Sequence, residues 1–268
     1  MRRLVIFVLL LSQLGWADDV ASLVTDMRGI ARDLIGQGAA RQEYEEFVKR
    51  HQLKALSYPT YIKNKLAFEA TRDAGLWHIG YRITDEEPNS DQIWRQWRQL
   101  SRVGRGQVTA QAECDELSAL YAFLARKLGV NGVGLFWPTS NHTVAVWQLT
   151  DSQGSPVRVV VPTTPIFLGR HDGFDARGFD PWKQEVIYEY GRGDAPDDFP
   201  LAPGLTRFFL QQLRDYGGAS QKLLHELRYL RQEAWLGKRS ESKLSALERH
   251  FTSSPDQRAI AAFRRSFP

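Results

Sequence analysis

The sequence contains one cysteine, Cys114, so the chain cannot form an intramolecular disulfide. It also lacks an HExxH motif, a Cys/His cluster at metal-ligand spacing, and a Gly-rich phosphate loop between a strand and a helix. After residue 17, no apolar run approaches the length of about eighteen residues that is typical of a membrane-spanning helix. We therefore expect no metal, no cofactor and no transmembrane segment in the mature chain.

The composition is that of a globular protein. Of the 268 residues, 43% are hydrophobic and 12% aromatic, which is enough apolar mass for a sizeable core in one or two domains. The same aromatic content argues against a disordered chain.

The first seventeen residues are typical of a signal peptide. Arg2 and Arg3 precede an apolar run over residues 4–11, and small residues lead to a cleavage site that we place after Ala17. We expect export to the periplasm or secretion; an uncleaved N-terminal anchor is the alternative. The two arginines supply half of the net charge of +4, so the pI near 9.2 does not indicate nucleic-acid binding.

Hydrophobic periodicity predicts helices at the start of the chain. Residues 19–36 and 40–53 have helical spacing, a third helix follows Pro59, and a short one covers residues 93–100. We divide the chain into a signal peptide, an N-terminal helical segment, a core with a loop-rich extension, and a C-terminal helical segment: residues 1–17, 18–88, 89–202 and 203–268.

The middle of the chain changes character. A helix is predicted over residues 112–128, with Gly129 as its terminator, and strands over 132–137, 142–149 and 157–161 with hairpin connections. This order predicts an α+β fold in which a helix packs on a small antiparallel sheet, with helical extensions at both ends.

The C-terminal segment is basic. From residue 204 onward it holds 12 Lys/Arg against 6 Asp/Glu. Such helices can make weak contact with an anionic surface, although a solvated helix face explains the charge as well. In the motif "SPDQ", Ser254 is the expected N-cap of the last helix, with Pro255 at its first position.

Cys114 lies in the first turn of the predicted middle helix, on the same face as Leu117. The helix N-terminus favours the thiolate, while the neighbouring acidic residues oppose it. His142 begins the second strand, where alternation places it with Val144 and Val146. If that face packs against the helix, the imidazole of His142 lies close enough to the Cys114 thiol to act as its base. The alternative for Cys114 is a buried structural thiol.

The segments "AECDELSALYAFLARKLGV", "HTVAVW" and "VVVPTT" resemble the core of the transglutaminase-like superfamily, relatives of papain-type cysteine peptidases. The resemblance covers roughly residues 90–165. It implies that Cys114 attacks a carboxamide or peptide carbonyl and that His142 transfers the proton. An exported peptidase, amidase or transglutaminase acting on envelope peptides or proteins is the implied function.

The sequence departs from this family at the third catalytic position. The family has an aspartate in an Asp-Pro-Thr step, where this chain has Val161. Asn141, Thr163, Asp172 or Asp175 could replace it in orienting the imidazole. The alternative function is a non-catalytic binding module that has lost the acid.

An acyl-transfer site also needs donors for the oxyanion. The backbone N–H of Cys114 is one. Gln107 and Gln111 precede the cysteine, and either could supply a second, much as a glutamine does in papain-type enzymes. Both could equally be loop glutamines.

Overall fold

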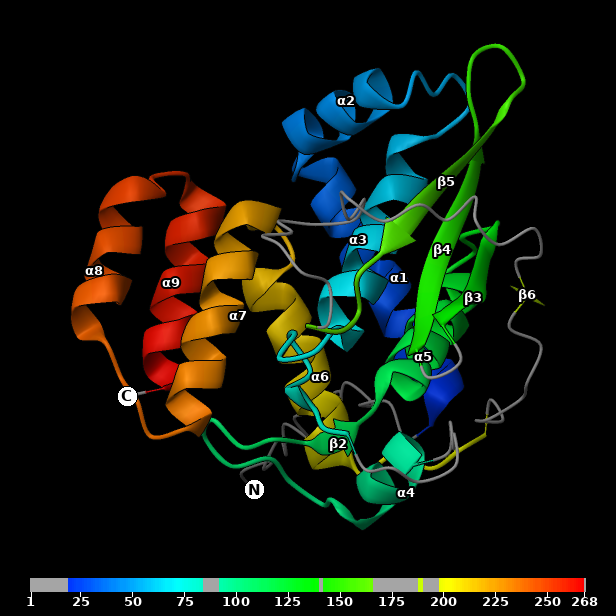
Figure 1. Ribbon diagram of the computed structural model, residues 1–268. Helices are drawn as coiled ribbons and strands as arrows, with labels where there is room; N and C mark the ends of the chain where they lie inside the picture. The colour runs from blue at the N-terminus through cyan, green and yellow to red at the C-terminus, as the bar shows by residue number, and fades with distance from the viewer. Residues whose placement is uncertain (1–18, 84–91, 140–141, 166–187, 190–197, 268) are drawn as a thin grey trace, which may run out of the picture.

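The computed structural model describes residues 19–83, 92–139, 142–165, 188–189 and 198–267. Within them, helices surround one face of a four-stranded antiparallel sheet, and a separate pair of short parallel strands lies near its end (Figure 1). The predicted α+β class is confirmed. The predicted signal peptide lies outside the described residues.

The N-terminal helices are close to their predicted positions: α1 Val20–Gly36, α2 Arg41–Arg50 and α3 Tyr58–Thr71. Asp19 caps α1 by accepting a hydrogen bond from the backbone N–H of Ser22. Helix α3 is buried along nearly its whole length because it packs against α1, α5 and α6. It therefore occupies the centre of the helical layer.

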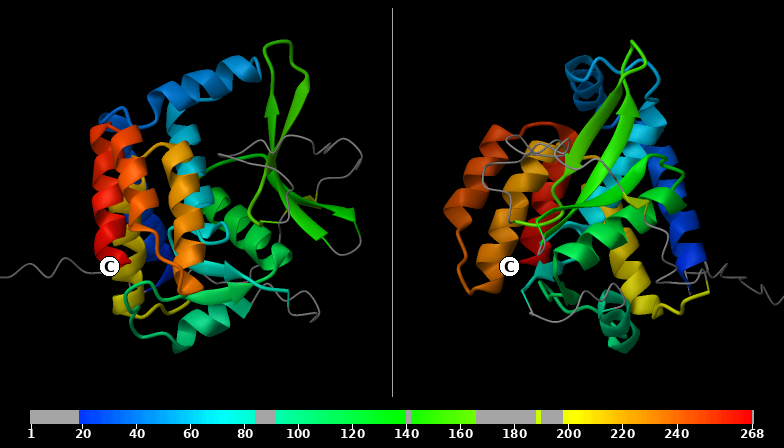
Figure 2. Two further views of the ribbon diagram at one scale, coloured as in Figure 1. Left: turned by 60° about the vertical axis from the view of Figure 1, so that its left-hand side comes forward. Right: turned by 45° about the vertical axis from the view of Figure 1, so that its right-hand side comes forward.

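The four strands of the sheet lie in the order β5-β4-β3-β6. Their bounds are β3 Val133–Thr139, β4 His142–Thr150, β5 Pro156–Val161 and β6 Tyr188–Glu189. The three strands predicted from the sequence are confirmed, as are their hairpin connections. Helix α5 covers one face of this sheet, with α3 behind it (Figure 2).

Helix α5 (Cys114–Lys127) has well-defined ends. Glu113 and Glu116 form a capping box at its start. At its end Gly129 takes a left-handed conformation, with φ of 83°, and Val130 donates its N–H to the carbonyl of Ala125. The predicted terminator is confirmed.

The short parallel ladder joins β1 (Ile79–Tyr81) to β2 (Ala110–Ala112), with Tyr81 opposite Ala112. Helix α4 (Gln92–Gln99) lies between these strands in the sequence and contacts β2. Because β2 leads into α5 after one residue, this ladder positions the start of the helix that carries Cys114.

The C-terminal helices complete the core. They are α6 Pro203–Tyr216, α7 Gln221–Trp235, α8 Glu241–His250 and α9 Ser254–Ser266. One cluster of buried apolar residues extends from Val20 to Phe263. The predicted N-cap of α9 was wrong by one residue: Ser253, not Ser254, accepts the N–H of Asp256, so Pro255 is the second helical residue. No described helix is long and apolar enough to cross a membrane.

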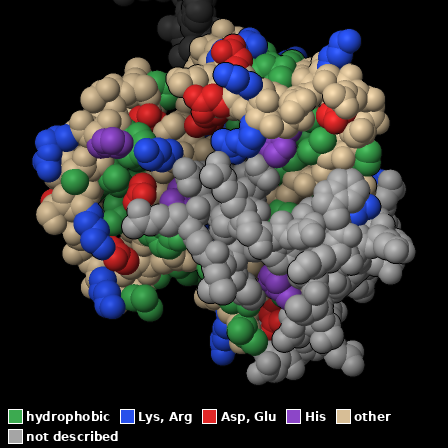
Figure 3. Space-filling model, turned by 45° about the horizontal axis from the view of Figure 1, so that its top comes forward, with side chains coloured by type: hydrophobic (Ala, Val, Ile, Leu, Met, Phe, Trp, Pro, Cys, Tyr) green, Lys and Arg blue, Asp and Glu red, His purple; other side chains and the backbone are tan. Residues whose placement is uncertain are grey.

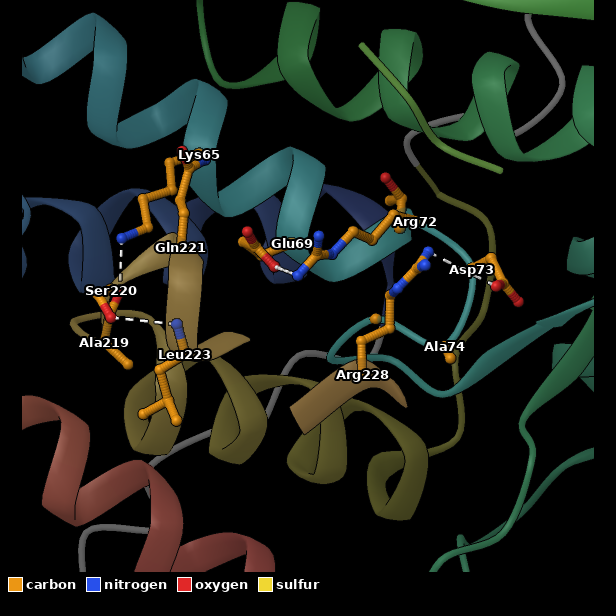
Figure 4. A network of polar contacts seen from close by, with 12 residues as sticks. Lys65, Glu69, Arg72, Asp73, Ala74, Ala219, Ser220, Gln221, Leu223 and Arg228 are labelled. Atoms are coloured by element: carbon orange, nitrogen blue, oxygen red, sulfur yellow. Dashed lines mark hydrogen bonds and ion pairs between the residues drawn. The ribbon is translucent and has the colours of Figure 1, made fainter. Parts of the chain in front are cut away.

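Buried charged residues connect α3 to the C-terminal helices (Figure 4). Glu69 and Arg72 form an ion pair of 2.7 Å with both side chains almost fully buried. Lys65 donates to the carbonyl of Ala219 at 2.6 Å. Arg228 of α7 lies 3.8 Å from the carboxylate of Asp73, which follows α3. The contacts of Lys65 and Asp73 fix the C-terminal segment to the centre of the fold.

Candidate functional site

Cys114 is the first residue of α5, as predicted, and its side chain is 6% exposed. The backbone N–H of Glu113 is bound by the carboxylate of Glu116, so the chain enters the helix in a fixed conformation. The sulfur is therefore held at a helix N-terminus, where unpaired backbone N–H groups gather.

The sulfur lies beside the edge of β4. The backbone N–H of Thr143 donates toward Cys114, and the hydroxyl of Ser118, one turn along α5, donates to the Thr143 carbonyl at 3.4 Å. Strand β5 ends at Val161, opposite Ala145, so it does not pair with Thr143. The first turn of α5 thus occupies the place that a longer β5 would take along β4.

His142 begins β4, pairs with Thr139 and is 9% exposed. Alternation places its side chain on the same face as Val144 and Val146, which form a small apolar cluster apart from the main core. Helix α5 packs instead on the face that carries Ala145, so the condition stated for His142 to face the helix is not met. Both faces of this strand are apolar, and alternation alone could not distinguish them.

The first turn of α5 nevertheless lies near the start of β4, because Ser118 donates to the carbonyl of Thr143, the residue after His142. Backbone N–H bonds of a strand point along the plane of the sheet. Thr143 therefore presents its backbone groups along the free edge of β4, toward the first turn of α5.

Burial governs the protonation of both groups. It raises the pKa of the Cys114 thiol; the Thr143 N–H opposes this effect, and the charge of Asp115 adds to it. Burial lowers the pKa of His142. At neutral pH the site therefore holds a protonated thiol and a neutral imidazole. The dipole of α5 does not overcome the cost of burying a thiolate.

The two predicted glutamines have separate surroundings. Gln111, in β2, pairs with Gly80, and a Cβ atom at Gly80 would lie 2.8 Å from its side-chain oxygen. The carboxamide of Gln111 therefore lies over β1. In the sequence Gln111 precedes Cys114 by three residues. The carboxamide oxygen of Gln107 accepts a hydrogen bond from the N–H of Gly104 at 2.8 Å. This bond holds the Gln107 side chain within the turn that precedes β2.

Val161 is fully buried on the α5 face of the sheet. Thr163 follows it and joins three segments: its carbonyl accepts the N–H of Asp73 at 2.7 Å, and its hydroxyl lies 2.9 Å from that of Ser118. The other residues considered for the third catalytic position, Asn141, Asp172 and Asp175, lie outside the described residues.

No sequence pattern indicated that Tyr81 lies at this site. Its place opposite Ala112 sets it beside the start of α5. Burial raises the pKa of Tyr81 to about 12, and the negative charge of a Cys114 thiolate contributes to the shift. Its N–H donates to the carboxylate of Asp73 at 2.8 Å. Only the β1–β2 pairing places Tyr81 at the site, and no local motif predicts that pairing.

A scan against protein-family models matched none, and searches of curated proteins and of solved structures gave no match either. Among the described residues, no group of three or more His, Cys, Asp and Glu side chains is placed to hold a metal ion. The chemistry of the site is therefore argued from Cys114 and its surroundings.

Proposed function

We propose that the protein is a cysteine-dependent acyl-transfer enzyme with a transglutaminase-like core. The observation that carries the proposal is the position of the Cys114 thiol at the start of α5, where backbone N–H groups of the first helical turn lack helical partners and the edge of β4 at Thr143 lies beside that turn. Such donors also suit the oxyanion of a tetrahedral intermediate. In this proposal the base is His142, which begins β4 one residue before Thr143.

The protonation states define the proposed reaction. As the Cys114 sulfur attacks the carbonyl carbon, the neutral His142 takes the thiol proton, and the carbonyl oxygen becomes an oxyanion. The imidazolium then protonates the leaving amine, and a thioester remains. To do this the imidazole turns over the edge of β4, where β5 has ended. Water as the second acceptor gives a peptidase or amidase; an amine gives a transglutaminase.

The proposed substrates are peptides or proteins of the cell envelope. This part of the proposal rests on the predicted export of the chain. A peptide carbonyl or a side-chain carboxamide would present the electrophile that Cys114 requires.

The second candidate is a non-catalytic binding module with the same core. It is favoured by Val161, which fills the family's acid position with a fully buried apolar side chain, and by the raised pKa of the Cys114 thiol. In this case Cys114 and His142 are structural residues of the strand edge.

Reaction with p-nitrophenyl acetate distinguishes the two candidates. An enzyme is expected to release p-nitrophenol while an acetyl group appears on Cys114 by intact-mass and peptide analysis. Cys114→Ala should abolish this acetylation, and His142→Ala should slow it about 10²–10⁴-fold. His250→Ala, at an exposed position of α8, is the matched control. Acetylation that is insensitive to His142→Ala would support the binding module.

A further inference from the structure

We propose that one end of the helical layer docks on an anionic phospholipid bilayer. We call this surface the basic end and define it by five exposed side chains: Arg102, Arg105, Lys238, Arg239 and Arg265. They come from the turn before β2, the α7–α8 connection and the last turn of α9. The inference is independent of the proposed chemistry at Cys114.

The three segments are held together by specific contacts. The indole N–H of Trp235 donates to the carbonyl of Gly106 at 2.7 Å. The ring of Phe267 lies against the same glycine, where a Cβ atom would be 3.0 Å away. Both aromatic rings also pack against His78. The ends of α7 and α9 accordingly lie beside this turn (Figure 1). The five cations are thus carried on one fixed part of the fold.

The basic end has charges of a single sign. No Asp or Glu occurs in residues 98–108, 234–240 or 257–267. The nearest acidic residues in the sequence, Glu233 and Glu241, are already paired with Lys243 and Arg264.

In the part of the chain that the structure describes, none of the five cations forms an ion pair. By contrast, basic and acidic side chains are interspersed on the face seen in Figure 3. The single-sign cluster therefore creates a local positive potential that an anionic surface would complement.

Helix dipoles explain only some of these charges. The carbonyl ends of α7 and α9 favour nearby cations such as Lys238 and Arg265. Arg102 and Arg105 lie outside any helix, in the segment that packs beside these helix ends. They bring two further cations to the same surface.

An exposed apolar side chain in one segment of the basic end indicates the partner. Leu236, beside Lys238 in the α7–α8 connection, is 74% exposed. An exposed apolar residue beside cations fits a bilayer interface, where it enters the headgroup region while the cations meet lipid phosphates. A nucleic acid or another soluble polyanion has no apolar layer that could accept the Leu236 side chain. We therefore assign the anionic bilayer as the occupant.

Vesicle co-sedimentation of the full chain tests the proposal. The vesicles contain phosphatidylglycerol and phosphatidylcholine, and pure phosphatidylcholine vesicles correct for any binding that is independent of charge. Lys238→Glu combined with Arg239→Glu is expected to weaken the phosphatidylglycerol-dependent binding at least about 25-fold, since each cation near an anionic bilayer contributes about a fivefold gain. Leu236→Ser is expected to weaken it as well.

Lys49→Glu combined with Lys54→Glu is the matched control. It makes the same charge change at exposed positions in and just after α2, at the opposite end of the molecule (Figure 1). Three results would overturn the proposal: no binding of the wild-type chain to phosphatidylglycerol, equal losses in the two double variants, or no effect of Leu236→Ser. The last result would point to a soluble polyanion instead.

Discussion

Ser118 should be more important for stability than its hydrogen-bonding partner Thr163. We propose that the Ser118 hydroxyl donates its one proton to the Thr143 carbonyl at 3.4 Å, which makes the Thr163 hydroxyl the donor in the 2.9 Å contact between the two hydroxyls. Ser118→Ala therefore leaves a carbonyl without its donor and a hydroxyl without its acceptor, both buried. Thr163→Val removes a donor but leaves the bond from Ser118 to Thr143 in place.

The expected magnitudes follow from this asymmetry. An unsatisfied buried polar group costs about 1–3 kcal/mol, so Ser118→Ala should lower the free energy of unfolding by about 2–3 kcal/mol. Thr163→Val should cost about 1 kcal/mol, near the net value of one hydrogen bond. The double variant should lose less than the sum, because Thr163 no longer has a hydroxyl to leave unpaired.

Urea unfolding measures all three variants, provided that the slope with denaturant stays constant. Thr164→Val is the matched control: this neighbouring hydroxyl is buried and has no hydrogen-bond partner within the described residues, so its removal should be neutral or stabilising. A larger loss for Thr163→Val than for Ser118→Ala, or additive single losses, would refute the proposed direction of the bonds.

Three further predictions concern charge and pH. Asp115→Asn should lower the pKa of Cys114, and the rate of iodoacetamide labelling at a fixed pH below that pKa should rise. Burial, aided by the charge of Arg231, holds the pKa of His78 well below 6.5. The unfolded chain therefore binds a proton that the folded chain does not, and the free energy of unfolding should fall by up to about 1.4 kcal/mol per pH unit below pH 6.5, less steeply in His78→Asn. Glu69→Gln should cost about 3–5 kcal/mol in urea unfolding, because Arg72 stays buried without its counter-charge.

Local pattern predicted the elements around the site well. The apolar stripe and the glycine at position 129 located α5, and alternation with turn residues located the three main strands, because these signals act over a few neighbouring residues. The position of Cys114 at a helix start followed directly. The error at the start of α9 arose because Ser253 and Ser254 both fit an N-cap, and only the bond to the Asp256 N–H distinguishes them.

The surroundings of the thiol could not be predicted in the same way. Whether the His142 side chain faces α5 depends on which face of β4 packs against that helix. Both faces of β4 are apolar, so the sequence does not distinguish them. Tyr81 and Asp73 reach the site through a parallel strand pair and a bond to Thr163, between segments far apart in the chain. The surroundings of the Cys114 thiol could not be predicted because they depend on tertiary contacts, for which local sequence patterns carry no signal.

The shared core of the two chain ends has a consequence for biosynthesis. Lys65 forms a hydrogen bond with Ala219, and Asp73 forms an ion pair with Arg228. Contacts that complete the interior therefore join residues about 150 positions apart in the sequence. A ribosome-bound chain cannot form these contacts until the segment through Arg228 has emerged. Folding of this core should thus wait for the synthesis of α7 and proceed slowly, as is typical of topologies with distant contacts.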